Sequence, residues 1–577
     1  MNSKTPKFDK ALEGILNNLK PHQKECRECG EIFDIFKEDI QFYKKLQVPP
    51  PSLCWRCRSQ RRLGYKVSFL PNFYKKSCSA PGHNEKIVTY YSEKNPVKVY
   101  DDDYYLSDRW DSTQFGVDFI SEKSFFKQYK KVELAVPHQS LFKDPKAIDS
   151  DYVISGTSSK NCYYMGVPYF SENIYYGHLA VSSKDCINIF ESMECEKCFD
   201  IMLSIKGYNL IFCVDITECV DSAFLYDCKN CSDCFMSSNL RHKKYYFYNQ
   251  RFSKEAYKNK IKEINLGSRR VYEKHKKEFG KMLSNTIYKN VINLRASDCL
   301  GSGMVNSKNC FQSFNNFNCE NNRYASSADR ATDSMDVYGM NHASELYETA
   351  GVGPASKSKF SVSCRQVVEV EYSSECNNCE NCFACFGLKN KKYHIFNKEY
   401  TKEEYWKKVD ELKTKMLERG EYGEFFPLKD SPFPYQDSNA QVEFPMTEKE
   451  IKEKGWHWQD EIKSDIDLTK VKTLKAEDVP NNIQDVKDDI LKTPIICERT
   501  GKPFKITKFE LDFYRKMNVP LPIISPVERI KDLFQYRRPY KLYDTICAKC
   551  QKEIQTVHNP ESTENIYCEE CYNKEVV

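Results

Sequence analysis

The stretch Ser159–Cys186, which reads SKNCYYMGVPYFSENIYYGHLAVSSKDC, decides the fold of the middle of this chain. Every third residue in it is uncharged and mostly small: Ser159, Cys162, Met165, Pro168, Ser171, Ile174, Gly177, Ala180, Ser183 and Cys186. A period of three fits neither an α-helix, which repeats every 3.6 residues, nor a strand, which repeats every two. We therefore predict a tightly wound β-solenoid in which every third side chain points into a narrow interior.

The same period extends well beyond this stretch and occurs twice. It holds for thirty positions from Val153 to Leu240, which include no charge, no amide and no aromatic ring. It holds again for thirty positions from Gly301 to Leu388, where the only larger polar residues are Asn316, Asn322 and Thr349. Because 29% of the chain is charged, chance alone would place about seventeen charges on these sixty positions, and none is found.

A twelve-residue unit lies on top of the three-residue period. It is visible in Ser159-Lys160-Asn161-Cys162, Ser171-Glu172-Asn173-Ile174 and Ser183-Lys184-Asp185-Cys186. Twelve residues hold four inward positions, so one unit can form one coil; a coil of twenty-four residues is the alternative. The spacing resembles the twelve-residue right-handed β-solenoid of insect antifreeze proteins. The resemblance covers the winding only, because the Thr-x-Thr ice-binding face is missing here.

The two blocks are a duplication at an offset of 148 residues. Cys228-Lys-Asn-Cys231-Ser-Asp-Cys234-Phe235 recurs as Cys376-Asn-Asn-Cys379-Glu-Asn-Cys382-Phe383. Each block then runs into a predicted helix, the first beginning near Ser253 and the second at Thr401, where Thr401-Lys-Glu-Glu404 has the pattern of a capping box. Such helices would cover the exposed edge of each solenoid.

Seventeen of the 27 cysteines lie between Cys162 and Cys385, and all of these except Cys299 fall in the inward phase. We interpret them as small apolar fillers of the interior. The run Cys376, Cys379, Cys382 and Cys385 also has the spacing of iron–sulfur ligands, so a redox or iron–sulfur role is the alternative there. Disulfides between cysteines six residues apart, such as Cys379–Cys385, would need an oxidising compartment.

Large aromatic residues follow many inward positions: Tyr163-Tyr164, Tyr175-Tyr176, Phe199, Phe212, Phe224 and Phe235. They are too large for a narrow interior and must lie outside it. A stripe this apolar exceeds what a soluble monomer normally exposes. We expect it to be covered by the aromatic-rich residues 70–145, by the other block or by a partner.

Two Cys-x-x-Cys pairs near the N-terminus predict a metal site: Cys26, Cys29, Cys54 and Cys57. Four thiolates close a tetrahedral shell around Zn²⁺ and leave no open position for catalysis. We expect a hairpin and a Pro-rich stop between the pairs, followed by a helix that carries the second pair, as in a treble clef or zinc ribbon. That helix is basic, and its residues Arg56, Arg58, Arg61, Arg62 and Lys66 are candidate phosphate contacts.

A second site is predicted at the C-terminus, from Cys547, Cys550, Cys568 and Cys571. We expect a hairpin between its pairs, with strands at 554–557 and 566–567. The chain therefore has two predicted structural Zn²⁺ sites.

A degenerate copy of the first finger lies at a gapless offset of 471. Cys26 maps to Cys497, and the other three ligands become Thr500, Ser525 and Glu528. The apolar and turn residues persist, so we predict a metal-free copy of the finger.

Two smaller polar features lie in the aromatic-rich region. Asp101-Asp102-Asp103 is interpreted as a solvated turn. Cys78 and His83 form a possible pair of metal ligands, and two ligands are too few for a site.

The predicted fold is mixed and β-rich, with two tandem β-solenoid blocks of about 12-residue repeats flanked by treble-clef or zinc-ribbon modules. The expected domains are a finger at 1–68, an aromatic-rich α+β segment at 69–146, a solenoid block at 147–250, a helical connector at 251–296, a second block at 297–398, a helix at 399–424, a Pro/aromatic linker at 425–494, the finger copy at 495–543 and a zinc ribbon at 544–577.

Four parts of the chain resemble a family of multi-zinc-ribbon, Cys-rich repeat proteins of candidate-phyla bacteria. They are the finger Cys26 to Arg62, the segment Tyr100 to Pro137, the repeated Asn-Cys units and the terminal Tyr567-Cys568-Glu-Glu-Cys571-Tyr572. The resemblance implies the architecture and supplies no activity.

Composition and motifs favour a scaffold over an enzyme. Among 577 residues the formal net charge is only +5, which does not by itself indicate a nucleic-acid partner. We find no nucleotide-binding loop and no nucleophile motif. With neither a signal-peptide pattern nor a long apolar stretch, a cytoplasmic protein without a membrane partner is expected. The predicted function is a zinc-binding, non-enzymatic scaffold that binds nucleic acid (RNA or DNA) or a protein complex.

Overall fold

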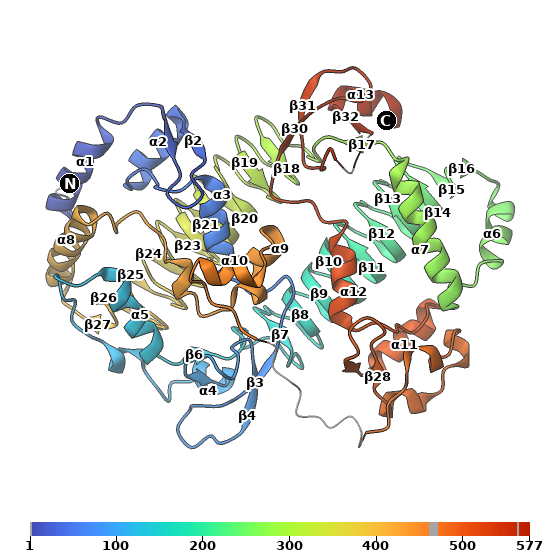
Figure 1. The fold of residues 1–577 in the computed structure, drawn as a ribbon, viewed down its shortest axis with the longest axis horizontal. Helices are drawn as coiled ribbons and strands as arrows, with labels where there is room; N and C mark the ends of the chain where they lie inside the picture. Colours follow the sequence, from blue (N-terminus) through green and yellow to red (C-terminus); the bar gives the residue numbers. More distant parts are fainter. Residues whose placement is uncertain (1–2, 461–470, 562, 564) are drawn as a thin grey trace. The chain divides into compact units, whose positions relative to one another are not determined.

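The computed structural model describes residues 3–460, 471–561, 563 and 565–577. The chain divides into two compact units, each with a ten-stranded sheet (Figure 1). Unit 1 comprises Met1–Val67, Asn72–Leu141 and Val291–Gln459, and unit 2 comprises Ser68–Pro71, Phe142–Asn290 and Asp460–Val577. The expectation of a mixed, β-rich chain with a few helices is confirmed.

The sheet of unit 2 is built from successive parallel strands. They are β7 (Val153–Ile154), β8 (Tyr163–Tyr169), β9 (Glu172–Val181), β10 (Lys184–Met193), β11 (Glu196–Met202), β12 (Tyr208–Val214), β13 (Val220–Tyr226), β14 (Ser232–Ser238), β15 (Lys244–Phe247) and β16 (Gln250–Arg251). Pairing partners are twelve residues apart, as where Lys184 lies between Glu172 and Glu196. The last pair, β15–β16, is antiparallel. The stacking repeat is therefore twelve residues.

The sheet of unit 1 follows the same plan. Its strands are β18 (Leu300–Ser302), β19 (Phe311–Phe314), β20 (Ser326–Thr332), β21 (Met335–Ser344), β22 (Tyr347–Ala350), β23 (Ala355–Ser356), β24 (Val367–Glu371), β25 (Glu380–Phe383), β26 (Lys392–Ile395) and β27 (Lys398–Glu399). The final antiparallel pair β26–β27 and the helix after it lie 148 residues beyond their counterparts in unit 2. The predicted capping box is present, because Thr401 and Glu404 bond each other's backbone N–H.

The helices and short strands surround these sheets. Unit 1 holds α1 (Pro6–Leu16), α2 (Lys37–Leu46), α3 (Trp55–Leu63), α4 (Asp102–Leu106), α5 (Phe125–Ala135), α8 (Lys402–Glu418), α9 (Asn439–Glu443) and α10 (Glu448–Glu453), with β1 (His22–Glu25), β2 (Ile32–Ile35), β3 (Tyr74–Ser77), β4 (Lys86–Thr89), β5 (Val99–Tyr100) and β6 (His138–Gln139). Unit 2 holds α6 (Lys254–Lys262), α7 (Arg269–Ser284), α11 (Lys508–Met517), α12 (Pro526–Phe534) and α13 (Glu569–Val576), with β17 (Tyr288–Lys289), β28 (Ile495–Ile496), β29 (Pro503–Phe504), β30 (Tyr543–Ile546), β31 (Glu553–Thr556) and β32 (Ile566–Tyr567). Each described helix is too short or too polar to cross a membrane.

The three-residue period has a backbone cause. Over long stretches of both sheets, the residue before each inward position has a positive φ, as at Asn161 (49°), Tyr164 (54°) and Val167 (55°). This left-handed conformation costs an ordinary L-residue about 1–2 kcal/mol, and Asn and Asp tolerate it best. Backbone hydrogen bonds between neighbouring repeats offset this cost, as where the Lys160 N–H donates to Ser171 O at 2.9 Å.

The recurring Asn and Asp also bond to one another along the sheet. Asn161 Nδ2 donates to Asn173 Oδ1 at 2.7 Å, and Asn173 Nδ2 donates to Asp185 Oδ1 at 2.7 Å. The fixed Asn/Asp position in the twelve-residue unit thus serves both the left-handed backbone and a side-chain ladder.

The outer aromatic stripes are covered by each unit's own chain. In unit 1 Tyr372 stacks on Phe360 at 4.3 Å between ring centroids and meets Phe125 of α5 edge-on at 4.9 Å. In unit 2 Phe212 and Phe224 pack against Phe279 of α7. The expected cover by residues 70–145 is found in unit 1, where it is α5. For the stripe of unit 2 the three expected covers are wrong, because α7 and the finger-copy helix α11 pack on it, as where Phe513 and Tyr514 contact Phe199.

Candidate metal centres

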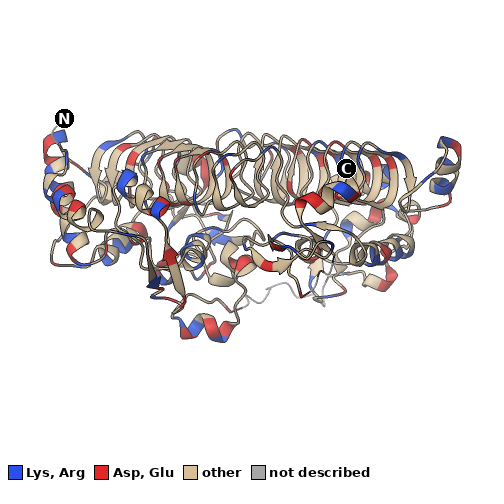
Figure 2. Cartoon of the chain, turned by 90° about the horizontal axis from the view of Figure 1, so that it is seen from above, with Lys and Arg blue, Asp and Glu red and all other residues tan. Residues whose placement is uncertain are grey.

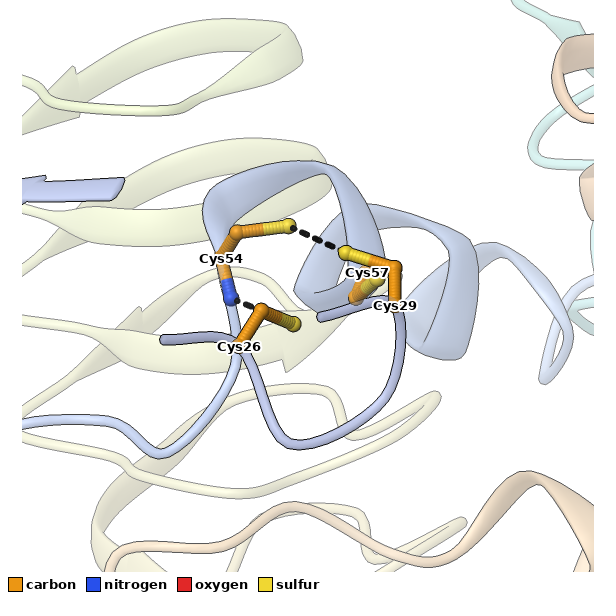
Figure 3. A group of neighbouring side chains, drawn as sticks. All are labelled: Cys26, Cys29, Cys54 and Cys57. Atoms are coloured by element: carbon orange, nitrogen blue, oxygen red, sulfur yellow. Dashed lines mark hydrogen bonds between the residues drawn. The ribbon is translucent and has the colours of Figure 1, made fainter. Parts of the chain in front are cut away.

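The first four-cysteine group combines a turn with the start of a helix (Figure 3). Cys26 and Cys29 lie on the knuckle between β1 and β2, where Gly30 has a φ of +74° that permits the turn. Cys54 is the N-cap of α3, and Cys57 lies in its first turn. The four sulfur atoms lie within 4.8 Å of one another, with Cys29 Sγ 3.8 Å from Cys54 Sγ.

The polypeptide between the two pairs differs from the prediction. The hairpin β1–β2 flanks the knuckle, and the longest element of the spacer is the helix α2, which was not predicted. The Cys54 N–H donates to Cys26 Sγ at 3.2 Å, which ties the start of α3 to the knuckle. Such amide bonds to sulfur orient a ligand and favour its thiolate.

The bare thiols influence one another's protonation. A hydrogen bond from Cys57 lowers the pKa of Cys54 to about 5, and the same bond raises the pKa of Cys57 far above its usual value. Burial raises the pKa of Cys29 to about 11. Four thiolates without a cation would repel one another, so a bound metal ion is the natural neutralising partner of the group.

The C-terminal group has the same construction. Cys547 and Cys550 lie between β30 and β31, and Cys568 is the N-cap of α13, which also carries Cys571. Cys550 Sγ lies 3.8 Å from Cys568 Sγ, and the Cys568 N–H donates to Cys547 Sγ at 3.3 Å. All four sulfur atoms lie within 4.8 Å of one another.

The hairpin predicted between strands 554–557 and 566–567 is wrong. β31 pairs with β30, on the other side of the knuckle, and β32 pairs in parallel with β17. Short strands of two residues have little local preference, so a partner from far along the chain decides their pairing.

The predicted basic segment points into unit 1. Arg58 Nε lies 2.9 Å from Asp336 Oδ2 on β21, and Arg62 Nη1 lies 2.9 Å from Glu348 Oε2 on β22. Arg61 forms ion pairs with Glu348 at 3.0 Å and with Glu424 at 2.9 Å. The side chains of Asp336 and Glu348 are 0% exposed.

The remaining two basic residues also face the protein. The Arg56 guanidinium lies over the Phe444 ring, and Lys66 Nζ donates to Ser363 Oγ at 3.1 Å. Burial lowers the pKa of Lys66 to about 8.

This burial contradicts the predicted phosphate contacts of Arg58, Arg61 and Arg62, whose guanidinium groups are bonded to carboxylates inside the fold. The sequence could not distinguish the two cases, because arginines on a buried helix and on a solvent-facing helix have the same spacing. In both cases each charge is stabilised by an opposite charge. Asp336 and Glu348 were not predicted as partners of these arginines; their only signal in the sequence is a carboxylate at an outward position of the repeat.

The finger copy of unit 2 has both helices of the first finger, and Thr500, Ser525 and Glu528 stand where three of its cysteines stand. Its helices α11 and α12 lie 471 residues after α2 and α3, with the same lengths. The Ser525 N–H donates to Cys497 Sγ at 3.3 Å, as Cys54 does to Cys26. Arg499 forms an ion pair with Glu528, which stands where Cys57 stands in the first finger.

The two fingers contact their own sheets through equivalent residues. Arg58 lies over the Tyr324 ring at 5.3 Å, and Arg529 lies over the Tyr176 ring at 4.8 Å. The two tyrosines are 148 residues apart, and the two arginines are 471 apart. The duplication therefore includes the sheet, the finger and the contact between them.

A second pair of contacts repeats in the same way. Tyr324 Oη donates to Asp39 Oδ2 at 3.2 Å, and Tyr176 Oη donates to Glu510 Oε2 at 2.8 Å. Asp39 and Glu510 are again 471 residues apart, on α2 and α11.

The Cys376, Cys379, Cys382 and Cys385 run lies inside the sheet of unit 1. The Cys379 S–H lies between two acceptors, Asn377 O at 3.3 Å and Leu388 O at 3.5 Å, and the other three thiols lie between carbonyls at the same offsets. The Ser171 hydroxyl makes the same pair of bonds in unit 2. Cysteine and serine thus play one packing role at inward positions.

A search of protein-family models found none that matches this chain, and neither a similar curated protein nor a similar solved structure was found. The functional interpretation therefore depends on the geometry described above.

Proposed function

We propose that this protein is a zinc-binding, non-enzymatic scaffold. In this proposal the two ten-stranded sheets are β-solenoid blocks with twelve-residue coils, and the two four-cysteine groups hold structural Zn²⁺. Four cysteine ligands suit tetrahedral Zn²⁺ and leave no position for a substrate. Each solenoid and its finger form one rigid platform.

The repeated contact between finger and sheet carries this proposal. The copy at α11 and α12 has lost three of four metal ligands and still places Arg529 on Tyr176. What the duplication has kept is therefore the packing of the finger on the sheet. In this proposal zinc stabilises the first finger internally, and the packing of the finger on the sheet stabilises the platform.

A protein is a better partner than a nucleic acid. The arginines of α3 that a phosphate would need are already paired inside unit 1. Figure 2 shows Lys and Arg interspersed with Asp and Glu along the chain. On the sheet of unit 2, for example, Glu172 lies between Lys160 and Lys184 at 3.7 and 3.3 Å. Mixed charges of this kind do not create the positive field that attracts nucleic acid.

The metal part of the proposal is tested with a matched pair of variants. Cys26→Ser removes a ligand of the first finger, and Cys497→Ser changes the equivalent residue of the metal-free copy. We expect Cys26→Ser to lower the zinc content of the full-length protein by one atom per chain, measured by plasma mass spectrometry. Cys497→Ser should leave it unchanged. Equal zinc content in Cys26→Ser and the wild type would refute the site.

The scaffold part is tested by hydrogen exchange. Because zinc closes the knuckle on which α3 rests, its removal by a chelator should increase exchange in α2 and α3. Exchange in α11 and α12 should not change. Equal loss of protection in both fingers would contradict the separate roles assigned to metal and packing.

A further inference from the structure

A third group of metal-ligating side chains lies outside the two four-cysteine centres. Cys78, His83 and Glu85 come from the loop between β3 and β4, and Asp101 is the N-cap of α4. One ligand atom from each of the four lies within 4.8 Å of the others. Cys78 and His83 are the possible pair seen in the sequence, and Asp101 belongs to the turn interpreted there as solvated. Glu85 had no signal in the sequence, and only the folded loop brings the four residues together.

The backbone fixes the loop in place. The Cys78 N–H donates to Glu85 O at 3.0 Å, which closes the loop beyond the last β3–β4 pair. Gly82 has a φ of +81°, and the His83 N–H donates to Ala80 O at 3.1 Å. The turn therefore directs the His83 ring back toward Cys78 and α4.

Each carboxylate is oriented by a backbone bond to one of its oxygens. Asp101 Oδ1 accepts from the Tyr104 N–H at 2.8 Å, and Glu85 Oε2 accepts from the Asn84 N–H at 3.0 Å. The other oxygens face the group. Asp101 Oδ2 lies 3.4 Å from Cys78 Sγ and 3.2 Å from His83 Nδ1, and Glu85 Oε1 lies 2.8 Å from the same nitrogen. Such second-shell bonds hold metal ligands in position.

The charges of the group are not balanced by the protein. Among the residues that the structure describes, the ion pairs of Glu85 and Asp101 are both with His83. The His83 Nδ1–H can donate to Glu85 Oε1 at 2.8 Å while the Cys78 S–H donates to Asp101 Oδ2 at 3.4 Å. The hydrogen bonds are thus satisfied, and the two carboxylate charges have no Lys or Arg ion pair in the part of the chain that the structure describes. Cys78 is buried, with 6% of its surface exposed, whereas the Glu85 side chain is 55% exposed, so the group is open to solvent on the side of Glu85. A divalent cation at the centre would satisfy all four groups.

We propose that Cys78, His83, Glu85 and Asp101 bind Zn²⁺ as a third centre of this protein. A thiolate, an imidazole and two carboxylates all belong to the ligands that Zn²⁺ accepts, and four protein ligands fill its tetrahedral shell. The ion would join the β3–β4 loop to the start of α4. Because carboxylates replace thiolates, this centre should release zinc more readily than the four-cysteine centres.

The test is the zinc content of the full-length protein after dialysis against metal-free buffer. We expect three atoms per chain in the wild type and two in Cys78→Ser/His83→Asn. The control Cys299→Ser changes a half-buried cysteine outside the three groups and should keep three atoms. Tryptophan fluorescence of each variant checks that unit 1 remains folded.

A milder pair of variants guards against a folding defect. Glu85→Gln removes a ligand charge on an exposed loop, and Glu93→Gln makes the same change at a comparably exposed glutamate of the same region. Glu85→Gln should weaken zinc at the third centre by about 10-fold or more in competition with a chelator, and Glu93→Gln should not.

The outcomes separate this inference from the proposed function. Two atoms in the wild type, with one lost in Cys26→Ser, would overturn the third centre and leave the scaffold intact. No loss in Cys26→Ser, with one atom lost in Cys78→Ser/His83→Asn, would support the third centre and refute the zinc finger.

Discussion

The buried ion pairs beneath α3 give the sharpest prediction. Glu348→Gln keeps the shape of the side chain and removes the charge that Arg61 and Arg62 share at 3.0 and 2.9 Å. Arg62 retains Asp336 at 3.3 Å, and Arg61 retains Glu424. The variant therefore leaves one excess positive charge on Arg61 and Arg62, whose side chains are 9% and 2% exposed.

The expected cost follows from this burial. Removing one partner of a buried ion pair destabilises a protein by about 3–5 kcal/mol. Because both arginines retain a second carboxylate, we expect the lower end, about 3 kcal/mol of the free energy of unfolding of unit 1. Replacing the pair together, in Arg62→Met/Glu348→Leu, should recover part of this loss, since no uncompensated charge is created at that pair.

The assay is urea unfolding followed by tryptophan fluorescence, in mildly alkaline buffer because burial raises the pKa of Glu348. All five tryptophans lie in unit 1, so the signal reports on this unit alone. The midpoint should fall while the slope is unchanged. Glu345→Gln, on a half-buried residue three positions earlier, is the matched control. A loss below about 1 kcal/mol in Glu348→Gln would show that α3 does not rest on these carboxylates.

Three further predictions concern charge, cysteine chemistry and partners. Burial alone would raise the pKa of Glu371, but the ammonium groups of Lys359 and Lys413 lower this pKa to about 2, below its unfolded value of 4.5. The stability that Glu371 contributes is therefore present above pH 4.5 and is lost as the pH falls toward 2. The loss is at most about 3 kcal/mol, and Glu371→Gln should remove this pH dependence from unfolding curves. Cys379→Ser should leave zinc content unchanged and the protein free of iron, because serine makes the same carbonyl bonds; iron that is present in the wild type and lost in the variant would favour the redox alternative. Arg56→Ala should not change fluorescence anisotropy of labelled RNA or DNA with the protein at any salt concentration, and a salt-dependent affinity that this substitution weakens would revive the nucleic-acid partner.

The eight cysteines of the two four-cysteine groups could be predicted because their spacing is local. A Cys-x-x-Cys knuckle and a helix that begins at the next cysteine need only a few residues of sequence to be recognised. The strand pairing of β32 could not be predicted, because two residues carry almost no preference and their partner, β17, lies far away along the chain. The cover of the aromatic stripe in unit 2 was predicted wrongly for the same reason, because α11 lies far along the chain from the strands that it covers.

What the sequence by itself determined is the repeat. A side chain at every third position must be small when it points inward, and the left-handed position before it favours Asn or Asp. The period can therefore be recognised from the order of residue types alone. Only the tertiary structure decided which charged side chains are buried and which groups they pair with. Arg58 and Arg62 have the same spacing whether a helix faces water or a sheet, and carboxylates that lie hundreds of residues away determine which. Likewise Asp101 becomes a neighbour of Cys78 only because α4 begins beside the β3–β4 loop. Electrostatic neighbours are set by distance in space, and a local sequence pattern contains no information about that distance.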